Sequence, residues 1–365
     1  MRATRAIIHL DRFRRNIETV RDKVGSRLIC VPVKAGAYGH GALPMARAAL
    51  EAGAGYLATA TVEEGMELRA GGVTGPILLL SVPLIEEIPR LVSSGLIPLT
   101  ADKEFAAAAA AAAGREGIRL PVHLKIDTGM GRIGCRPEEA AELGRYIQSL
   151  KSLEYAGTAT HLAVSDSAAD ADTGYTRRQL ARFGEAVESL KQAGVDPGII
   201  HAANTGGVVF HRESWFDMVR PGILLYGYAP AGSALQTEPV MELVSRITFI
   251  KTVRKGESVS YGRLWTAPED RIIATIPLGY GDGFPRALSG NYQVYIRGRH
   301  YPLAGRICMD QCMIDLGTGT DIGRGEEVTV FGGAAPGAGY VAGLLGTIPY
   351  EITCNINKRV PRVYI

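Results

Sequence analysis

The chain has 365 residues, of which 46% are hydrophobic and 21% are charged, and its formal net charge is +3. This composition supplies enough apolar side chains for a soluble globular protein with two domains, or with one barrel and an addition. The near balance of 40 basic and 37 acidic side chains argues against nucleic acid, a membrane surface or a polyanionic substrate as a partner.

The amino terminus and the cysteines indicate the compartment. The first twenty residues carry five arginines and two acids without an unbroken apolar run, so we expect neither a secretory signal nor a membrane anchor. No segment approaches the ~20 apolar residues of a membrane-spanning helix. The five cysteines are scattered and form no Cys-x-x-Cys pair, which disfavours a disulfide framework or a zinc site. We expect a cytoplasmic protein with reduced thiols and no bound metal.

Strand-length apolar runs recur through the first two thirds of the chain, and segments with helical periodicity separate most of them. Eight βα units over about 220 residues are typical of a closed parallel (β/α)8 barrel, the TIM-like architecture. The expected strands are residues 28–33, 56–60, 77–80, 97–99, 122–126, 155–160, 199–202 and 218–219. The expected helices are residues 12–24, capped by Asp11, and residues 43–51, 62–70, 85–92, 103–113, 138–150 and 177–192.

The pattern changes near Gly232. Beyond it, β-branched runs are broken by glycine-containing turns with no helices between them, which predicts a mostly antiparallel β domain. The expected strands there are residues 240–253, 271–278, 292–296, 311–316 and 327–331. We therefore predict an α/β chain with a barrel at residues 10–232 and a C-terminal β domain at residues 233–365, and we expect residues 1–9 to form a strand that joins the β domain.

Lys34 ends the first buried strand, just before a cluster of glycines and alanines. An ammonium leaving a buried strand is unfavourable unless it reaches water, a charge partner or a covalent partner. Two interpretations are open: a lysine that extends to solvent, and a lysine that forms a Schiff base with a carbonyl ligand.

The other strand ends favour the second interpretation, because reactive groups of a (β/α)8 barrel come from the carboxyl ends of its strands. Asp127 and Arg132 follow the fifth strand, His161 the sixth and Arg220 the eighth. The glycine-rich loops after the seventh and eighth strands, the first beginning at Asn204, lie where barrels commonly bind phosphate. A lysine, an anion site and an arginine near both suggest pyridoxal 5'-phosphate (PLP).

Several motifs make the chain similar, essentially end to end, to the alanine racemase family of PLP enzymes. They combine a lysine–tyrosine–histidine loop, an Asp-Thr-Gly-Met-Gly-Arg loop and several short motifs of the β domain. The motifs are Val33-Lys34-Ala35 with Ala37-Tyr38-Gly39-His40-Gly41, residues 125–132, Arg220-Pro221-Gly222-Ile223, Val259-Ser260-Tyr261-Gly262, residues 279–283, residues 305–310 and Pro349-Tyr350-Glu351.

The resemblance implies a role for each matching position. Lys34 would hold PLP as a Schiff base, and Arg220, supported by His161, would face the pyridine nitrogen. Arg132 and the backbone N–H of Met309 would bind the substrate carboxylate, and Lys125 matches a lysine that is carbamylated in some members. Cofactor-binding residues would further include those of the phosphate site: Tyr38, Asn204, Thr205, Gly222, Ile223 and Tyr350.

The departures from the family pattern are few. Gly36 stands where asparagine is usual, Thr205 where serine is frequent and Phe284 where tyrosine is common. Thr205 keeps the hydroxyl, whereas Gly36 removes a polar side chain beside the lysine loop.

Inverting an amino acid requires that a proton leaves one face of the α-carbon and another arrives on the opposite face. Lys34 is the candidate for one base and Tyr261 for the other. Because a phenol has an unperturbed pKa of ~10, Tyr261 would need cationic neighbours, for which His161 and Arg220 are the candidates. The resemblance implies a homodimer in which Tyr261 and Met309 come from the partner chain.

The predicted reaction is the PLP-dependent interconversion of L- and D-alanine, which supplies D-alanine for peptidoglycan. A broader racemase acting on serine and alanine remains an alternative, because small pockets discriminate such pairs by only ~10²-fold. An amino-acid decarboxylase of the same barrel class and a non-catalytic PLP carrier fit less well, since Tyr261 and the Met309 loop would have no role in them.

Overall fold

The computed structural model describes residues 2–365. The strand expected at residues 1–9 includes Met1, which lies outside the described residues. The chain separates into two compact units. One unit, which we call the barrel unit, comprises residues 13–37 and 42–238. The other, which we call the β unit, comprises the remaining described residues, including residues 38–41.

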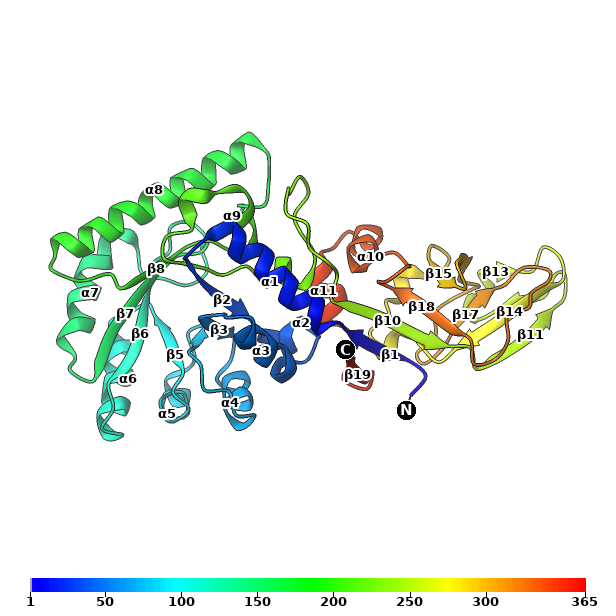
Figure 1. Cartoon of the computed structure of the whole chain (residues 1–365), viewed down its shortest axis with the longest axis horizontal. Helices are drawn as coiled ribbons and strands as arrows, with labels where there is room; N and C mark the ends of the chain where they lie inside the picture. The colour runs from blue at the N-terminus through cyan, green and yellow to red at the C-terminus, as the bar shows by residue number, and fades with distance from the viewer. Residues whose placement is uncertain (1) are drawn as a thin grey trace. The chain divides into compact units, whose positions relative to one another are not determined.

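The barrel unit is built on eight parallel strands in the order β8–β7–β6–β5–β4–β3–β2–β9. The circle nearly closes, because the N–H of Asp217, just before β9, donates to the carbonyl of Ile200 in β8 at 3.0 Å. The expected (β/α)8 architecture is confirmed (Figure 1). The strands are β2 (Leu28–Pro32), β3 (Tyr56–Thr59), β4 (Ile77–Leu79), β5 (Ile97–Thr100), β6 (Leu120–Lys125), β7 (Leu153–Ala159), β8 (Ile199–His201) and β9 (Met218–Val219).

Helices lie outside these strands, as Figure 1 shows for α5, α6 and α7. Alanines make up most of the buried face of α6, because a helix with small side chains can approach the strands closely. The helices are α1 (Leu10–Val24), which begins in the β unit, and α3 (Ala42–Glu51), α4 (Val62–Ala70), α5 (Ile88–Ser93), α6 (Lys103–Arg115), α7 (Ala140–Ser149), α8 (Asp170–Gln192) and α9 (Thr205–Phe210).

The β unit holds a six-stranded sheet in the order β16–β15–β18–β10–β1–β19, a three-stranded sheet β11–β14–β17 and a hairpin β12–β13. β1 (Arg5–Ile8) pairs antiparallel with β10 and parallel with β19, so the unit is mostly but not wholly antiparallel. The other strands are β10 (Met241–Arg246), β11 (Phe249–Val253), β12 (Ser258–Val259), β13 (Trp265–Thr266), β14 (Arg271–Ile276), β15 (Gln293–Ile296), β16 (Arg299–Pro302), β17 (Cys312–Asp315), β18 (Glu327–Phe331) and β19 (Arg362–Tyr364).

Several details of the sequence interpretation are wrong. The run at residues 240–253 forms two strands in different sheets. The chain changes partner between them, because the N–H of Ile247 donates to the carbonyl of Glu326 and the N–H of Thr248 donates to the carbonyl of Thr275. Helix α1 begins at Leu10, so Asp11 lies in its first turn instead of capping it. The helix expected at residues 177–192 is too short, since α8 begins at Asp170, and two helices that were not predicted, α10 (Ala338–Leu345) and α11 (Pro349–Cys354), follow β18.

The segment α2 (Lys34–Tyr38) is a left-handed turn. The φ angles of Ala35, Gly36, Ala37 and Tyr38 are 51°, 59°, 53° and 52°. For residues with a Cβ this conformation costs roughly 1–2 kcal/mol each. It therefore normally occurs at single residues, and several in succession are rare. Three of the four residues carry a Cβ, so the structure around Lys34 must stabilise the turn.

Candidate active site

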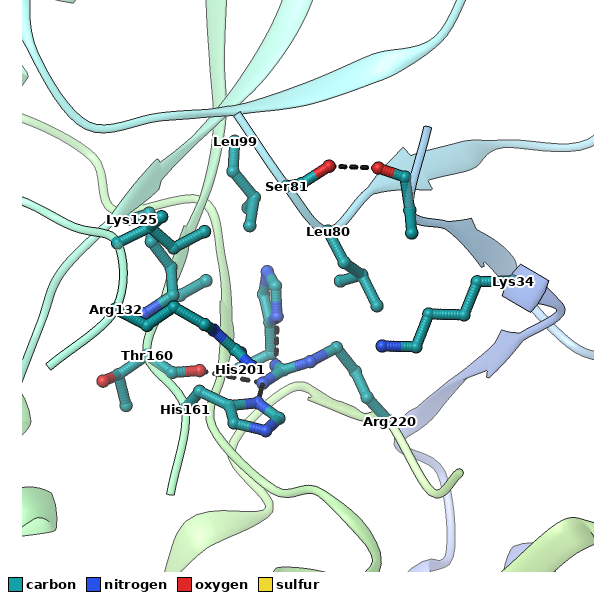
Figure 2. Close-up of a pocket in the computed structure, with 13 residues that line it drawn as sticks. Lys34, Leu80, Ser81, Leu99, Lys125, Arg132, Thr160, His161, His201 and Arg220 are labelled. Atoms are coloured by element: carbon teal, nitrogen blue, oxygen red, sulfur yellow. Dashed lines mark hydrogen bonds between the residues drawn. The ribbon is translucent and has the colours of Figure 1, made fainter. Parts of the chain in front are cut away.

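The carboxyl ends of the parallel strands place polar side chains around one mouth of the barrel. Lys125 ends β6, His201 ends β8 and Arg220 follows β9 directly. Parallel strands have their carboxyl ends on the same side, so these residues meet. Together with Lys34 and His161 they line a cavity of about 260 Å³ (Figure 2).

Positive charge dominates this cavity. Lys34, Lys125, Arg132 and Arg220 line it, and none of its described lining residues is an aspartate or glutamate. Figure 2 shows Lys34 extending from its turn toward the cavity that Arg220 also lines. Cations gathered without carboxylates repel one another and attract an anionic ligand. The cavity is therefore suited to a molecule with carboxylate, phenolate or phosphate groups.

Arg220 is fixed by a set of neutral acceptors. One amino group of its guanidinium, Nη2, donates to the carbonyls of Thr160 at 2.8 Å and Ala202 at 3.1 Å. The other, Nη1, donates to Nδ1 of His201. Among the described residues no carboxylate pairs with Arg220, although it is 5% exposed. Burial lowers the pKa of Arg220 to about 10, so it keeps its charge at neutral pH.

A chain of two imidazoles supports this guanidinium. A guanidinium can only donate, so Nδ1 of His201 accepts, and neutral His201 then carries its proton on Nε2. That N–H donates to Nδ1 of His123 at 2.8 Å. Burial and the charge of Arg220 lower the pKa of His201 well below its usual value and that of His123 to about 3. Both rings are therefore neutral, and their tautomers follow from Arg220.

His161 corrects one expectation. Its Nδ1 lies 3.4 Å from Nη2 of Arg220, in line with the predicted contact. Burial, and then the charge of Arg220, lower the pKa of His161 well below its usual value. The prediction of His161 as a cationic neighbour for Tyr261 is wrong, because the ring is neutral at physiological pH.

Lys125 is a buried lysine with an altered protonation equilibrium. It is 4% exposed, and its Nζ donates to the carbonyl of Ile126 at 2.9 Å. Burial, followed by the charge of Arg220, lowers the pKa of Lys125 to about 7. Near neutral pH a large fraction of this amine is unprotonated and nucleophilic.

The loop that carries Arg132 is closed on itself. The N–H of Asp127 donates to the carbonyl of Cys135 at 2.9 Å. The carboxylate of Asp127 accepts from the N–H groups of Gly129 at 2.9 Å and Gly131 at 3.1 Å. These bonds lower the pKa of Asp127, although its partial burial opposes them. The loop presents Arg132 to the cavity from a fixed backbone.

The two glycine-rich loops are joined to each other. The backbone N–H of Gly222 donates to the hydroxyl of Thr205 at 3.0 Å, which leaves the hydroxyl proton free to donate to another group. Ile223 begins the next 3-10 turn. The side chain of Asn204 is used within its own loop, since it accepts from the N–H of Gly207 and donates to the carbonyl of Leu162.

Tyr38 and Tyr350 meet in the β unit. Their rings are 5.1 Å apart between centroids and nearly perpendicular. A Cβ on Gly39 would lie 2.0 Å from the carbonyl oxygen of Thr353, so only glycine permits this close approach of residues 38–41 to α11. The predicted role of both tyrosines in phosphate binding remains a prediction.

Tyr261 and Met309 also belong to the β unit. Both side chains are exposed, at 69% and 54%. Ser260, in the left-handed region with a φ of 68°, donates to the carbonyl of Arg306 and lies 3.3 Å from the sulfur of Cys308. This contact brings the tyrosine turn and the methionine loop together. Their approach to Lys34 remains a prediction.

Two cavity residues that bond to Arg220 were not predicted from the sequence. His201 and Thr160 both contact Arg220, and both stand at the carboxyl end of an expected strand. A rule that takes every polar residue at a strand end would have found them.

Among residues 2–365 no group of His, Cys, Asp and Glu side chains forms a candidate metal site. Within residues 2–365, none of the helices combines the length and the hydrophobicity that a membrane-spanning helix requires.

Comparisons with known proteins agree with this geometry. Residues 8–230 match the family model of the alanine racemase N-terminal domain, and residues 240–364 match that of the C-terminal domain. The alanine racemase of Treponema denticola is 48% identical over 100% of this chain and 99% of its own length. For the alanine racemase of Treponema pallidum the identity is 44% and the coverage is 100% of both chains.

Solved structures give the same result. A structure of the alanine racemase of Clostridium difficile 630 has a TM-score of 0.95 at 36% identity, covering 100% of this chain and 96% of that one. The structure of the Bacillus anthracis alanine racemase with bound L-Ala-P has a TM-score of 0.92 at 34% identity, covering 100% and 95%. Both parts of the chain and its full length are thus accounted for, and the chain belongs to the alanine racemase family.

Proposed function

We propose that this chain interconverts L- and D-alanine with PLP as its cofactor. The observation that carries the proposal is the cavity of four cations without a carboxylate, at the barrel mouth of an alanine racemase family member. We further propose that the enzyme acts in the cytoplasm and that its product supplies D-alanine for peptidoglycan.

The residues of the barrel mouth fit PLP. Lys34 offers an amine for covalent attachment, and Arg220 offers a guanidinium that no carboxylate of the described residues neutralises. The hydroxyl of Thr205 and the neighbouring backbone N–H groups offer donors for a phosphate. Tyr38, Tyr350 and Ile223 complete the proposed phosphate site, and Asn204 holds its loop. Bound PLP supplies an electron sink that stabilises negative charge on the substrate α-carbon.

In this proposal two bases act on opposite faces of the α-carbon. The amine of Lys34 takes or returns the proton on one face, and the phenolic oxygen of Tyr261 does so on the other. Of the two cationic neighbours expected for the phenol, the proposal keeps Arg220, since His161 is neutral. Arg132 and the N–H of Met309 would hold the substrate carboxylate.

We also propose that Tyr261 and Met309 reach the cavity from the partner chain of a homodimer. Their high exposure in the single chain supports this. Water is expected to be excluded from a catalytic base during proton transfer, so another chain would have to cover these side chains in the active enzyme. An exposed hollow next to Tyr261 includes Phe249 and Met313, apolar side chains suited to a subunit contact.

Lys125 is proposed to carry a carbamate. A carbamate forms when an unprotonated amine bonds to carbon dioxide and releases a proton to water, and the lowered pKa of Lys125 provides the unprotonated form near neutral pH. The product is an anion between two arginines, Arg132 and Arg220, whose charges already oppose protonation of the amine.

The direct test is incubation of the purified protein with a panel of L-amino acids, read by chiral chromatography. We expect formation of D-alanine that depends on added PLP. Serine in the panel measures the breadth of the substrate range. Release of carbon dioxide from a basic amino acid, or no change of configuration in any member, would contradict the proposal.

A further inference from the structure

Glu64 has no part in the proposed chemistry, yet it contacts the segment that follows Lys34. One carboxylate oxygen, Oε1, accepts a hydrogen bond from the backbone N–H of Ala35 at 2.6 Å. The other, Oε2, accepts from the N–H of Ala60 at 2.8 Å and lies 3.4 Å from the N–H of Thr61. The carboxylate therefore joins the residue after Lys34 to the carboxyl end of the neighbouring strand, β3.

The position of Glu64 explains how it can do this. It is the third residue of α4, where the hydroxyl of Thr61 accepts from its N–H at 3.2 Å. In such a capping box the glutamate normally returns one bond to the N-cap backbone. Strands β2 and β3 are neighbours, and the N–H of Val33 donates to the carbonyl of Ala58. The start of α4 consequently lies beside the turn that begins at Lys34.

The turn itself needs such a partner. It holds Ala35, Ala37 and Tyr38 in the left-handed region, where a side chain is unfavourable. A backbone bond also runs from the N–H of Ala37 to the carbonyl of Val33, just before the turn, at 2.7 Å. A charge-assisted bond of 2.6 Å to Ala35 is among the stronger interactions available to a backbone N–H.

We propose that Glu64 is a positioning residue that holds the left-handed turn after Lys34, and so aims the Lys34 amine into the cavity. The catalytic importance of the Lys34 orientation rests on the proposed function. The contact between Glu64 and the turn does not, because it is a feature of this chain's own structure. Glu64 does not line the cavity, so it acts through the turn.

A matched control exists within the same fold. Glu87 also reaches back to an N-cap backbone, accepting from the N–H of Leu84 at 2.8 Å, but its hydrogen bond and its ion pair with Arg90 lie outside residues 34–38. The variants Glu64→Ala and Glu87→Ala therefore both lose a cap, and only the first loses the bond to Ala35. Glu64→Gln keeps one carbonyl acceptor, and it replaces the alanine variant if that does not fold.

The first measurement is amide hydrogen exchange of the cofactor-free protein. We expect Glu64→Ala to accelerate exchange at residues 35–38 by about tenfold or more, as loss of a bond to a charged acceptor implies. Glu64→Gln should give a smaller acceleration, and Glu87→Ala none. Equal exchange in Glu64→Ala and wild-type protein would overturn the proposal, as would equal acceleration by Glu87→Ala.

The second measurement is the rate at which added PLP is trapped on Lys34 by borohydride, identified by peptide mass. We expect slower labelling and weaker PLP binding in Glu64→Ala, and wild-type behaviour in Glu87→Ala. Unchanged labelling in a loosened turn would overturn the positioning role. If wild-type Lys34 is not labelled, the proposed function fails, while the exchange comparison still decides whether Glu64 holds the turn.

Discussion

Arg220 is the side chain whose surroundings bear most directly on the choice of reaction. It is buried and remains charged, and its hydrogen bonds go to backbone carbonyls and neutral imidazoles. A guanidinium in this setting does not give up its proton at neutral pH. Opposite the pyridine nitrogen it would disfavour protonation of that nitrogen, and with it the return of a proton to the wrong carbon.

We therefore predict that Arg220→Glu lowers racemisation by at least ~10²-fold, the scale of a positioned acid or base, and raises transamination. Chiral chromatography measures the first effect and pyruvate formation the second. Arg115→Glu, at an exposed position at the end of α6, is the control and should change neither. A slower enzyme with an unchanged ratio of the two products would count against this role.

Lys125 allows a test at the level of one atom. Because its pKa is lowered to about 7, the unprotonated amine becomes abundant as the pH rises through that value. We predict a carbamate signal in carbon-13 NMR with labelled bicarbonate, growing between about pH 6 and pH 8. The signal should be missing in Lys125→Met. A signal in wild-type protein that survives this substitution would assign the carbamate to another residue.

At the scale of elements, the barrel strands could be predicted because each is an apolar run that ends in a polar residue. The break between β10 and β11 could not, since apolar residues continue through Ile247 while its hydrogen bonds turn to Glu326. Helix α10 was missed because its glycines resemble a loop, yet Val341 and Ala342 are buried by packing. Tertiary contacts decided both cases against local pattern.

The site shows the same division. Lys34, His161 and Arg220 were predictable from strand ends and from the family motifs. The left-handed turn was not, because Ala35 and Ala37 carry no preference for that conformation and only contacts from elsewhere impose it. The two carboxylate oxygens of Glu64 likewise bind the N–H groups of Ala35 and Ala60, which follow two different strands. No local sequence pattern shows that these strands are neighbours.

The turn gives a prediction at this scale. Replacing Ala35 by glycine removes a Cβ from a left-handed residue that is exposed. We expect Ala35→Gly to raise the free energy of unfolding by about 0.5–1 kcal/mol, since the relief exceeds the added chain entropy. Ala107→Gly, at an exposed right-handed position of α6, should lower it by up to ~1 kcal/mol. If urea unfolding showed that both variants change the free energy of unfolding in the same direction, the left-handed conformation assigned to Ala35 would be contradicted.

For the whole molecule, buried neutral histidines link stability to pH. The pKa values of His123, His161 and His201 are lowered by burial, so the unfolded chain binds protons near pH 6.5 that the folded chain does not. Stability must then fall as the pH drops below 6.5, and it is regained above that value. Lys125 adds the same trend from pH 7 upward, because its folded pKa also lies below its unfolded value.

We predict a loss of about 4 kcal/mol of unfolding free energy per pH unit below about pH 6, one proton for each of the three histidines. Urea unfolding at a series of pH values measures this slope. His123→Leu should reduce the slope by one proton. Equal slopes in the His123→Leu and wild-type proteins would show that His123 is protonated in the folded state.

The proposed pairing of Lys34 with Tyr261 depends on two subunits. If each site takes its lysine from one chain and its tyrosine from the other, a mixed dimer of Lys34→Ala and Tyr261→Ala chains contains one intact site and one doubly altered site. Random mixing yields mixed dimers for half of the molecules, so activity should return to about a quarter of wild type.

The measurement is the rate of alanine racemisation after the two inactive variants are unfolded together and refolded, compared with each variant refolded alone. Recovery toward a quarter of the wild-type rate is the predicted result. If the refolded mixture stays at the sum of the two variants, lysine and phenol do not act across a subunit boundary, and the proposed site shared between two subunits is contradicted.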